Sequence, residues 1–172
     1  KTKKLSGEEI SKILLKANYN VKNLIVSSPT VNQVNKVINY SHKNNIKLLL
    51  GVGGGSVIDV TKLAAYELKK PFVSVPTSAA HDGIASPRAS LKHSKGAVSK
   101  TAVSPLAVLA DTKIIMKAPY KMLASGCADV ISNISAVMDW ELAHRLKGEE
   151  FSTHGAVLAK TAAEMLIENV ED

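Results

Sequence analysis

The chain has 172 residues, of which 45% are hydrophobic, and a formal net charge of +7. This length suits one domain or one and a fraction, and its apolar runs are too short and too often broken to span a membrane. The charge comes almost entirely from lysine and the seven aromatic residues are scattered, so we expect a solvated surface suited to anionic ligands and no nucleic-acid partner. The single cysteine, Cys127, excludes a disulfide framework and fits a reducing cytoplasm.

Helical patterns alternate with short apolar runs through the first two thirds of the chain. Such alternation predicts an α/β fold with a parallel sheet. An exposed hairpin or lobe is expected over Ser90–Lys100. We expect helices that begin at Ser6 or Gly7, near Thr30 and at Val57, and strands over Val21–Val26, Ile46–Leu50, Pro71–Val75 and Pro105–Asp111.

From Ile114 onward the pattern predicts helices alone. Pro119 suits a helix start, Ser125-Gly126 should break that helix, and Cys127–Leu146 should form the next. A last helix should begin at Phe151 or Ser152. We therefore expect an α/β domain over 1–113 and the start of an all-helical domain over 114–172.

A glycine-rich turn, Gly51-Val52-Gly53-Gly54-Gly55, joins an apolar run to a helical pattern. Glycines let a backbone approach a ligand closely, and a helix N-terminus attracts phosphate or pyrophosphate. Ser56 and Asp59 have the spacing of a capping box, with Asp in place of Glu or Gln. The turn lacks the Gly-Lys-Ser/Thr of a P-loop, and Ser56 replaces the third glycine of the usual dinucleotide fingerprint. A nucleotide site of another design is favoured over a plain tight turn.

Two further stretches carry candidate residues. The loop Thr77–Arg88 follows a predicted parallel strand at its carboxyl end, where open α/β sheets place ligands, and it holds His81 and Asp82 beside a glycine. Asp129 is the only formal charge between Met122 and Met138. A carboxylate on so apolar a helix is paired, hydrogen-bonded or bound to metal, and spacing alone favours a capping or core-satisfied aspartate.

Three motifs together resemble one superfamily of enzymes. The chain is similar over its whole length to dehydroquinate synthase, glycerol dehydrogenase and iron-containing alcohol dehydrogenase, and its Asp-Gly-Ile-Ala-Ser-Pro core looks most like archaeal sn-glycerol-1-phosphate dehydrogenases. The motifs are Gly51-Val52-Gly53-Gly54-Gly55-Ser56-Val57-Ile58-Asp59 with Lys62, Pro76-Thr77-Ser78-Ala79-Ala80-His81-Asp82-Gly83-Ile84-Ala85-Ser86-Pro87, and Ser125-Gly126-Cys127-Ala128-Asp129.

The resemblance implies a Rossmann-like parallel-sheet domain that binds NAD(P), followed by a helical domain that binds metal and substrate. It assigns substrate binding to Asp82, and substrate binding, catalysis and Zn²⁺ ligation to Asp129, although another divalent metal would also suit. By the same resemblance the opening strand and two histidine ligands lie outside these 172 residues, so the fragment alone is expected to be inactive. The implied cofactor residues are Gly53, Gly54, Gly55, Ser56, Val57, Ile58, Asp59, Thr77, Ser78, Ala79, Ala80 and Ser86.

The implied reaction is the reduction of dihydroxyacetone phosphate to sn-glycerol 1-phosphate by NADPH or NADH, for archaeal ether-lipid synthesis. Hydride goes to the carbonyl carbon while a metal polarises the carbonyl. We also expect a cytoplasmic homo-oligomer. The alternatives are a related metal-dependent glycerol dehydrogenase, a dehydroquinate-synthase-like enzyme, or a catalytically incomplete nucleotide-binding fragment.

Overall fold

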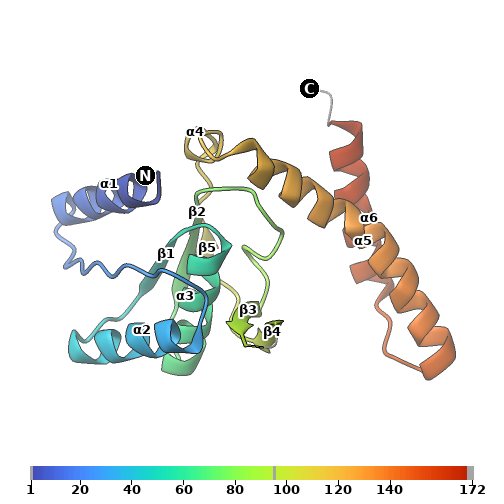
Figure 1. The fold of residues 1–172 in the computed structure, drawn as a ribbon, viewed down its shortest axis with the longest axis horizontal. Helices are drawn as coiled ribbons and strands as arrows, with labels where there is room; N and C mark the ends of the chain where they lie inside the picture. Colours follow the sequence, from blue (N-terminus) through green and yellow to red (C-terminus); the bar gives the residue numbers. More distant parts are fainter. Residues whose placement is uncertain (1, 95, 170–172) are drawn as a thin grey trace. The chain divides into compact units, whose positions relative to one another are not determined.

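The computed structural model describes residues 2–94 and 96–169 (Figure 1). The chain forms two compact units. The first comprises the described residues up to Ala79 together with Gly83–Pro119. The second comprises Ala80–Asp82 and the described residues from Tyr120 onward. The short segment Ala80–Asp82 thus belongs with the helical unit, although the residues on both sides of it belong with the α/β unit.

A parallel sheet organises the first unit, as the alternating pattern predicts. Its order is β1 (Leu49–Gly53), β2 (Phe72–Pro76) and β5 (Ala107–Val108), with β2 in the centre. Leu49 pairs with Phe72 and Gly53 with Pro76, so β1 and β2 end together at the carboxyl edge of the sheet. Figure 1 shows α3 (Gly55–Leu68) beside these strands.

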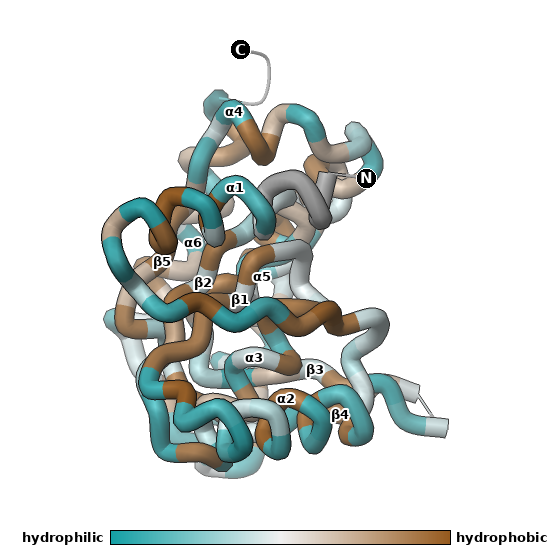
Figure 2. Tube along the Cα trace, turned by 90° about the vertical axis from the view of Figure 1, so that its left-hand side faces the viewer, coloured by the Kyte–Doolittle hydropathy of each residue, from teal (hydrophilic) through white to brown (hydrophobic). Residues whose placement is uncertain are grey.

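The first unit has three longer helices, α1 (Thr2–Lys16), α2 (Val31–Lys43) and α3, and a short α4 (Thr112–Ile115) follows the sheet. Of the longer helices, α2 and α3 contribute residues to the buried core. The predicted start near Thr30 is confirmed, because the Thr30 hydroxyl accepts the Gln33 N–H and caps α2. In Figure 2, α2 alternates between hydrophilic and hydrophobic residues. The buried core holds Val34, Val37, Leu49, Val60, Leu63, Ala64, Ala65, Phe72, Ala89, Leu91 and Ala102.

The strand predicted over Val21–Val26 is wrong, because among the described residues this segment joins no sheet. Leu24 and Val26 pack against the core, which explains the apolar signal in the sequence. The Ile25 carbonyl, however, accepts a bond from Lys36 Nζ at 3.4 Å. Apolar burial alone therefore does not make a strand when no ladder of backbone hydrogen bonds accompanies it.

Two other strands differ from their predicted bounds. The strand expected over Ile46–Leu50 begins at Leu49, because the Ile46 N–H still bonds to Ser41 in the turn that closes α2. It then continues through the glycines to Gly53. The strand expected over Pro105–Asp111 is only β5, and Asp111 instead caps α4 by accepting the Lys113 N–H at 2.8 Å.

An antiparallel hairpin confirms the expectation over Ser90–Lys100. Strand β3 (Arg88–His93) pairs with β4 (Gly96–Thr101), with Ser90 opposite Ser99. Ala89 and Leu91 are buried on one face of β3, whereas β4 is exposed along its length. The hairpin is therefore fixed to the first unit through β3.

The second unit contains two helices, α5 (Tyr120–Lys147) and α6 (Thr153–Glu168). The predicted break at Ser125-Gly126 is wrong: α5 is continuous and buries Gly126, so the glycine serves packing and not termination. The predicted start of the last helix is confirmed, with Ser152 capping α6 through the Gly155 N–H. The rings of Trp140 in α5 and Phe151 in the connection to α6 lie with their centroids 4.7 Å apart and are tilted by 55° to each other. No helix in the described part of the chain has the length and apolarity needed to cross a membrane.

Candidate functional site

The glycine turn leads directly from β1 into the N-terminus of α3. Gly54 is the cap, and its carbonyl accepts the N–H groups of Val57 and Ile58 at 2.9 and 3.2 Å. Gly55 and Ser56 are the first two residues of the helix, so their N–H groups have no carbonyl one turn earlier to bond. The predicted capping box is wrong, because Ser56 lies inside the helix and Gly54 makes no side-chain cap. Backbone N–H groups at a helix N-terminus suit an anion.

The glycines of this turn differ in what surrounds them. A Cβ at Gly53 would lie 2.8 Å from Val57 Cγ2, and one at Gly51 would lie 3.1 Å from Thr61 Cβ. A side chain at Gly53 would therefore clash with α3, and one at Gly51 would make a tight contact with it. A Cβ at Gly54 would meet only Ser78 Oγ, at an ordinary 3.5 Å. Packing therefore does not require a glycine at Gly54, and the backbone there is open on the side where a Cβ would lie.

The start of the second motif lies beside the turn. The Thr77 N–H donates to the Gly53 carbonyl at 3.0 Å, and Ser78 lies against Gly54. Thr77 and Ser78 are each 5% exposed. The structure thus brings together cofactor candidates from two motifs that are more than twenty residues apart. Among the described residues, no hydrogen bond is found between these candidates and Ala79 or Ser86.

A buried ion pair between Lys62 and Asp59, which the sequence patterns do not predict, supports α3 behind this turn. Lys62 is fully buried, with its Nζ 3.6 Å from Asp59 Oδ1, and the Asp59 Oδ2 accepts the Ser90 N–H at 3.2 Å. Both oxygens of the Asp59 carboxylate thus have protein partners. We therefore expect Asp59 to stabilise the helix behind the glycine turn. The signal was available, because the pair supplies the only two charges between Lys47 and Glu67.

Two carboxylates meet in the second unit. The Asp82 N–H donates to Asp129 Oδ2 at 2.9 Å, and Asp129 lies on α5, half-buried. Ser132 donates its hydroxyl to the Asp129 carbonyl at 2.7 Å. The structure therefore joins the two aspartates that the resemblance implicates in substrate binding, although 47 positions separate them.

The pKa of the Asp82 carboxyl is raised above its usual value. Burial contributes most, followed by the negative charge of Asp129 and a hydrogen bond with its side chain. The positive charge of His81 and a hydrogen bond from Asn133 act in the opposite direction and lower this pKa. Two carboxylates at this spacing repel each other, so the pair favours a bound proton or a cation.

We expect Asp129→Asn to lower the pKa of Asp82, because the substitution removes the neighbouring negative charge. His81→Gln should raise the same pKa, since it removes a positive charge. Both shifts can be followed by the carboxyl carbon resonance of Asp82 during an NMR titration of metal-free protein. An unchanged pKa in Asp129→Asn would show that the Asp129 charge does not contribute to the raised pKa of Asp82.

The carboxylate pair fits a divalent cation in charge and in donor type, because Asp is one of the ligands zinc accepts. The described residues contain no group of three or more His, Cys, Asp or Glu side chains that could hold a metal ion. A catalytic zinc takes three protein ligands and leaves one position open. The pair can therefore supply part of such a site.

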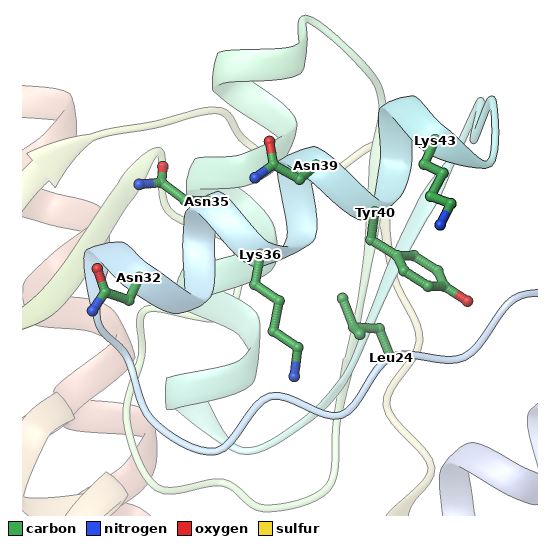
Figure 3. Close-up of a pocket in the computed structure, with 7 residues that line it drawn as sticks. All are labelled: Leu24, Asn32, Asn35, Lys36, Asn39, Tyr40 and Lys43. Carbon is green, nitrogen blue, oxygen red and sulfur yellow. The ribbon is translucent and has the colours of Figure 1, made fainter.

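A hollow of about 550 Å³ lies on the outer side of α2, away from every predicted site residue. Figure 3 shows Lys36 and Tyr40 pointing from the helix toward the extended segment that carries Leu24. Its lining holds none of the candidate residues, so it is not the candidate site. The lining residues are Leu24, Asn32, Asn35, Lys36, Asn39, Tyr40 and Lys43.

Curated relatives resemble the chain along almost its whole length. Proteins named glycerol-1-phosphate dehydrogenase (NAD(P)+) from Thermococcus sibiricus and Pyrococcus furiosus are each 47% identical over 171 residues. The match covers 99% of this chain and 49% of each relative. The chain therefore spans about half the length of the curated relatives it matches.

Solved structures and a family pattern agree with these relatives. A probable glycerol dehydrogenase from Sinorhizobium meliloti superposes with a TM-score of 0.73 at 22% identity, covering 84% of this chain and 42% of that one. An iron-containing alcohol dehydrogenase from Thermotoga maritima gives 0.65 at 21% identity, covering 78% and 44%. At these identities the likeness shows the fold alone. The pattern of the iron-containing alcohol dehydrogenase family matches residues 1–119. The chain belongs to the iron-containing alcohol dehydrogenase family.

Proposed function

We propose that the chain is part of an oxidoreductase that reduces dihydroxyacetone phosphate to sn-glycerol 1-phosphate with NADPH or NADH. The observation that carries this proposal is the 47% identity to proteins named glycerol-1-phosphate dehydrogenase, over 99% of the chain and across all three motifs. The product is the glycerol backbone that archaeal ether-lipid synthesis requires. In this proposal residues 1–113 bind the cofactor and residues 114–172 begin the metal- and substrate-binding domain.

The glycine turn is assigned to the cofactor pyrophosphate. The first N–H groups of α3, at Gly55 and Ser56, would donate to phosphate oxygens, and Gly54 would let the phosphates approach the backbone. Hydrogen bonds to a charged group stabilise by about 1.5–3 kcal/mol each, so two or three of them would supply much of the cofactor affinity. Thr77 and Ser78 stand beside the turn and would line the adjacent ribose and nicotinamide, together with Ala79, Ala80 and Ser86.

The carboxylate pair is assigned to the substrate and to a divalent metal, for which we propose Zn²⁺. Asp129 would be the chain's own metal ligand, and Asp82, fixed by its N–H to Asp129, would bind a substrate hydroxyl. A bound Zn²⁺ supplies Lewis-acid polarisation of a carbonyl. The Asp82 backbone bond keeps the Asp129 carboxylate in one orientation, as supporting hydrogen bonds do for metal ligands.

Substrate comparison tests the proposal. The product of the whole gene should oxidise NADPH or NADH in the presence of dihydroxyacetone phosphate, followed by the loss of absorbance of the reduced nicotinamide. It should act on glycerol far more slowly. Preference for glycerol or dihydroxyacetone would favour a related polyol dehydrogenase. Cofactor binding in calorimetry without turnover of either substrate would favour a nucleotide-binding protein without catalysis.

Asp82→Asn should harm turnover more than cofactor binding. Asp82 bonds to Asp129 in the helical unit and not to the glycine turn, so its loss should leave the pyrophosphate site intact. We expect kcat/KM for dihydroxyacetone phosphate to fall about a hundredfold, the size associated with misplaced substrate. The cofactor dissociation constant should change little. Equal losses in both quantities, or none in either, would contradict a substrate role.

We also propose that the enzyme works in the cytoplasm as a homo-oligomer. Its single cysteine, Cys127, is free, which suits a reducing compartment. Light scattering on the product of the whole gene tests the oligomer, and cell fractionation tests the compartment.

A further inference from the structure

A fully buried lysine on the cofactor helix holds both ends of the loop segment 83–88. The Nζ of Lys62 donates to the Gly83 and Arg88 carbonyls at 2.7 Å each. Lys62 has no exposed surface, and Asp59, one turn earlier on α3, lies 3.6 Å away. Burying an ammonium is costly unless acceptors replace its water, and here two carbonyls and a carboxylate surround it.

The acidic partner fixes the next part of the same stretch. Asp59 Oδ2 accepts the Ser90 N–H at 3.2 Å, so the pair contacts the chain at Gly83, Arg88 and Ser90. All these atoms belong to the first unit. The segment also bonds to β4, because the Ala102 N–H donates to the Pro87 carbonyl at 2.8 Å. The Lys62–Asp59 pair on α3 thus anchors the turn that leads from Gly83 to the start of β3 at Arg88, at both of its ends.

We propose that Lys62 is a positioning residue that fixes segment 83–88 to the helix whose first turn carries the cofactor. The segment begins directly after Asp82 and contains Ser86. The ammonium therefore fixes the backbone next to a proposed substrate residue and around a proposed cofactor residue. The acceptors of both Lys62 bonds are backbone carbonyls. Because a charged donor forms stronger hydrogen bonds than a neutral one, the ammonium holds these carbonyls more firmly than a neutral side chain would. Lys62 acts through the loop and touches neither substrate nor cofactor. The catalytic part of this inference rests on the function proposed above.

Hydrogen–deuterium exchange of the 172-residue chain tests the anchoring directly. Lys62→Met keeps the length and the apolar stem but removes the ammonium. The amides of Ser90 and Ala102, which donate to Asp59 and to the Pro87 carbonyl, should then exchange at least about tenfold faster, as expected for the loss of one bond to a charged group. Amides of α2 should not change. Lys69→Met, an exposed lysine just after α3, is the matched control and should leave the segment unchanged.

A second variant covers the case in which Asp59, left without its lysine, unfolds the protein. Asp59→Asn combined with Lys62→Met removes both charges, and the amide oxygen of Asn can still accept the Ser90 N–H. The Ala102 amide should still exchange faster in this double variant, because its acceptor is the Pro87 carbonyl of the segment. Unchanged exchange at Ala102 in either folded variant would overturn the proposal. Failure of both variants to fold would also overturn it, because Lys62 would then hold the whole unit together and not one segment.

The product of the whole gene separates positioning from general stability. Lys62→Met should lower kcat/KM for dihydroxyacetone phosphate at least about tenfold. The cofactor dissociation constant should change by a smaller factor, because the glycine turn is intact and Ser86 is the only proposed cofactor residue in the segment. A lower Tm with unchanged kcat/KM would overturn a positioning role. If the unsubstituted enzyme does not reduce dihydroxyacetone phosphate, the proposed function fails, and the exchange experiment still decides whether Lys62 anchors the segment.

Discussion

Asp129→Ala, introduced into the product of the whole gene, should lose both bound metal and activity. The unsubstituted protein should hold about one zinc per chain, measured by elemental analysis after dialysis. Loss of a metal that polarises the carbonyl removes several kcal/mol of transition-state stabilisation, so turnover should fall by more than about a thousandfold. Asp129 supplies one carboxylate, and without it the remaining ligands would not hold the ion.

Controls separate this effect from damage to α5. Asp139→Ala removes an exposed carboxylate from the same helix and should keep both metal and activity. Asp129→Asn keeps an oxygen that can accept the Asp82 N–H, so it should preserve the local fold while losing metal. Full activity in Asp129→Ala would show that the ligand assignment is wrong.

The 172-residue chain gives a complementary measurement. Its carboxylate pair should bind zinc only weakly, because the described residues contain no cluster of three or more potential ligand side chains. We expect little metal after dialysis and no reduction of dihydroxyacetone phosphate by this piece alone. Stoichiometric zinc in the isolated piece would contradict the assignment of Asp129 as one of three ligands.

The sequence predicted the fold best where burial and hydrogen bonding coincide. Strand β2 and helices α2, α3 and α6 were predicted from apolar spacing and from caps such as Thr30 and Ser152. The prediction failed at Val21–Val26, where the side chains pack against the core but the backbone does not join the sheet. Apolar spacing indicates which side chains are buried. Whether the backbone joins a sheet depends on a neighbouring strand, which the local sequence does not reveal.

The glycines of this chain have different structural roles at different positions. At Ser125-Gly126 a helix break was predicted, yet Gly126 is buried within α5. At Gly53 and Gly51 the need for glycine comes from Val57 and Thr61 on the following helix. Such contacts are set by tertiary packing, so a single sequence could show that the turn matters but not which glycine faces α3 and which is open.

The resemblance named the candidate site residues, but the sequence did not reveal how they are connected. The resemblance pointed to Asp82 and Asp129, and the structure adds that the backbone of one holds the carboxylate of the other. Lys62 appeared only as a member of a motif, and its two carbonyl partners lie 21 and 26 positions further along the chain. Local periodicity carries no information at that separation, so only the folded chain reveals that this charge anchors a loop.

Gly54→Val should weaken NAD(P)H binding at least about tenfold while leaving the fold and the metal content unchanged. Gly54 has φ −79° and ψ −179°, an extended conformation that valine adopts readily, and a Cβ there meets only Ser78 Oγ at 3.5 Å. Substitution therefore costs the folded state little, but the branched side chain would occupy the space through which phosphates reach the first N–H groups of α3. Loss of even one of those hydrogen bonds corresponds to about 1.5 kcal/mol or more, which is about tenfold in affinity.

Neighbouring glycines give the contrast that makes this result specific to the cofactor. Gly53→Val would collide with Val57 and should lower Tm together with affinity. Gly155→Val places a Cβ at the same 3.5 Å from a serine hydroxyl, that of Ser152, in the helical unit, and should leave affinity unchanged. Titration calorimetry gives the dissociation constants, and thermal unfolding monitored by circular dichroism gives the Tm. If Gly54→Val binds NAD(P)H as well as the unsubstituted chain, the turn serves only to connect β1 to α3, and the cofactor must be held elsewhere.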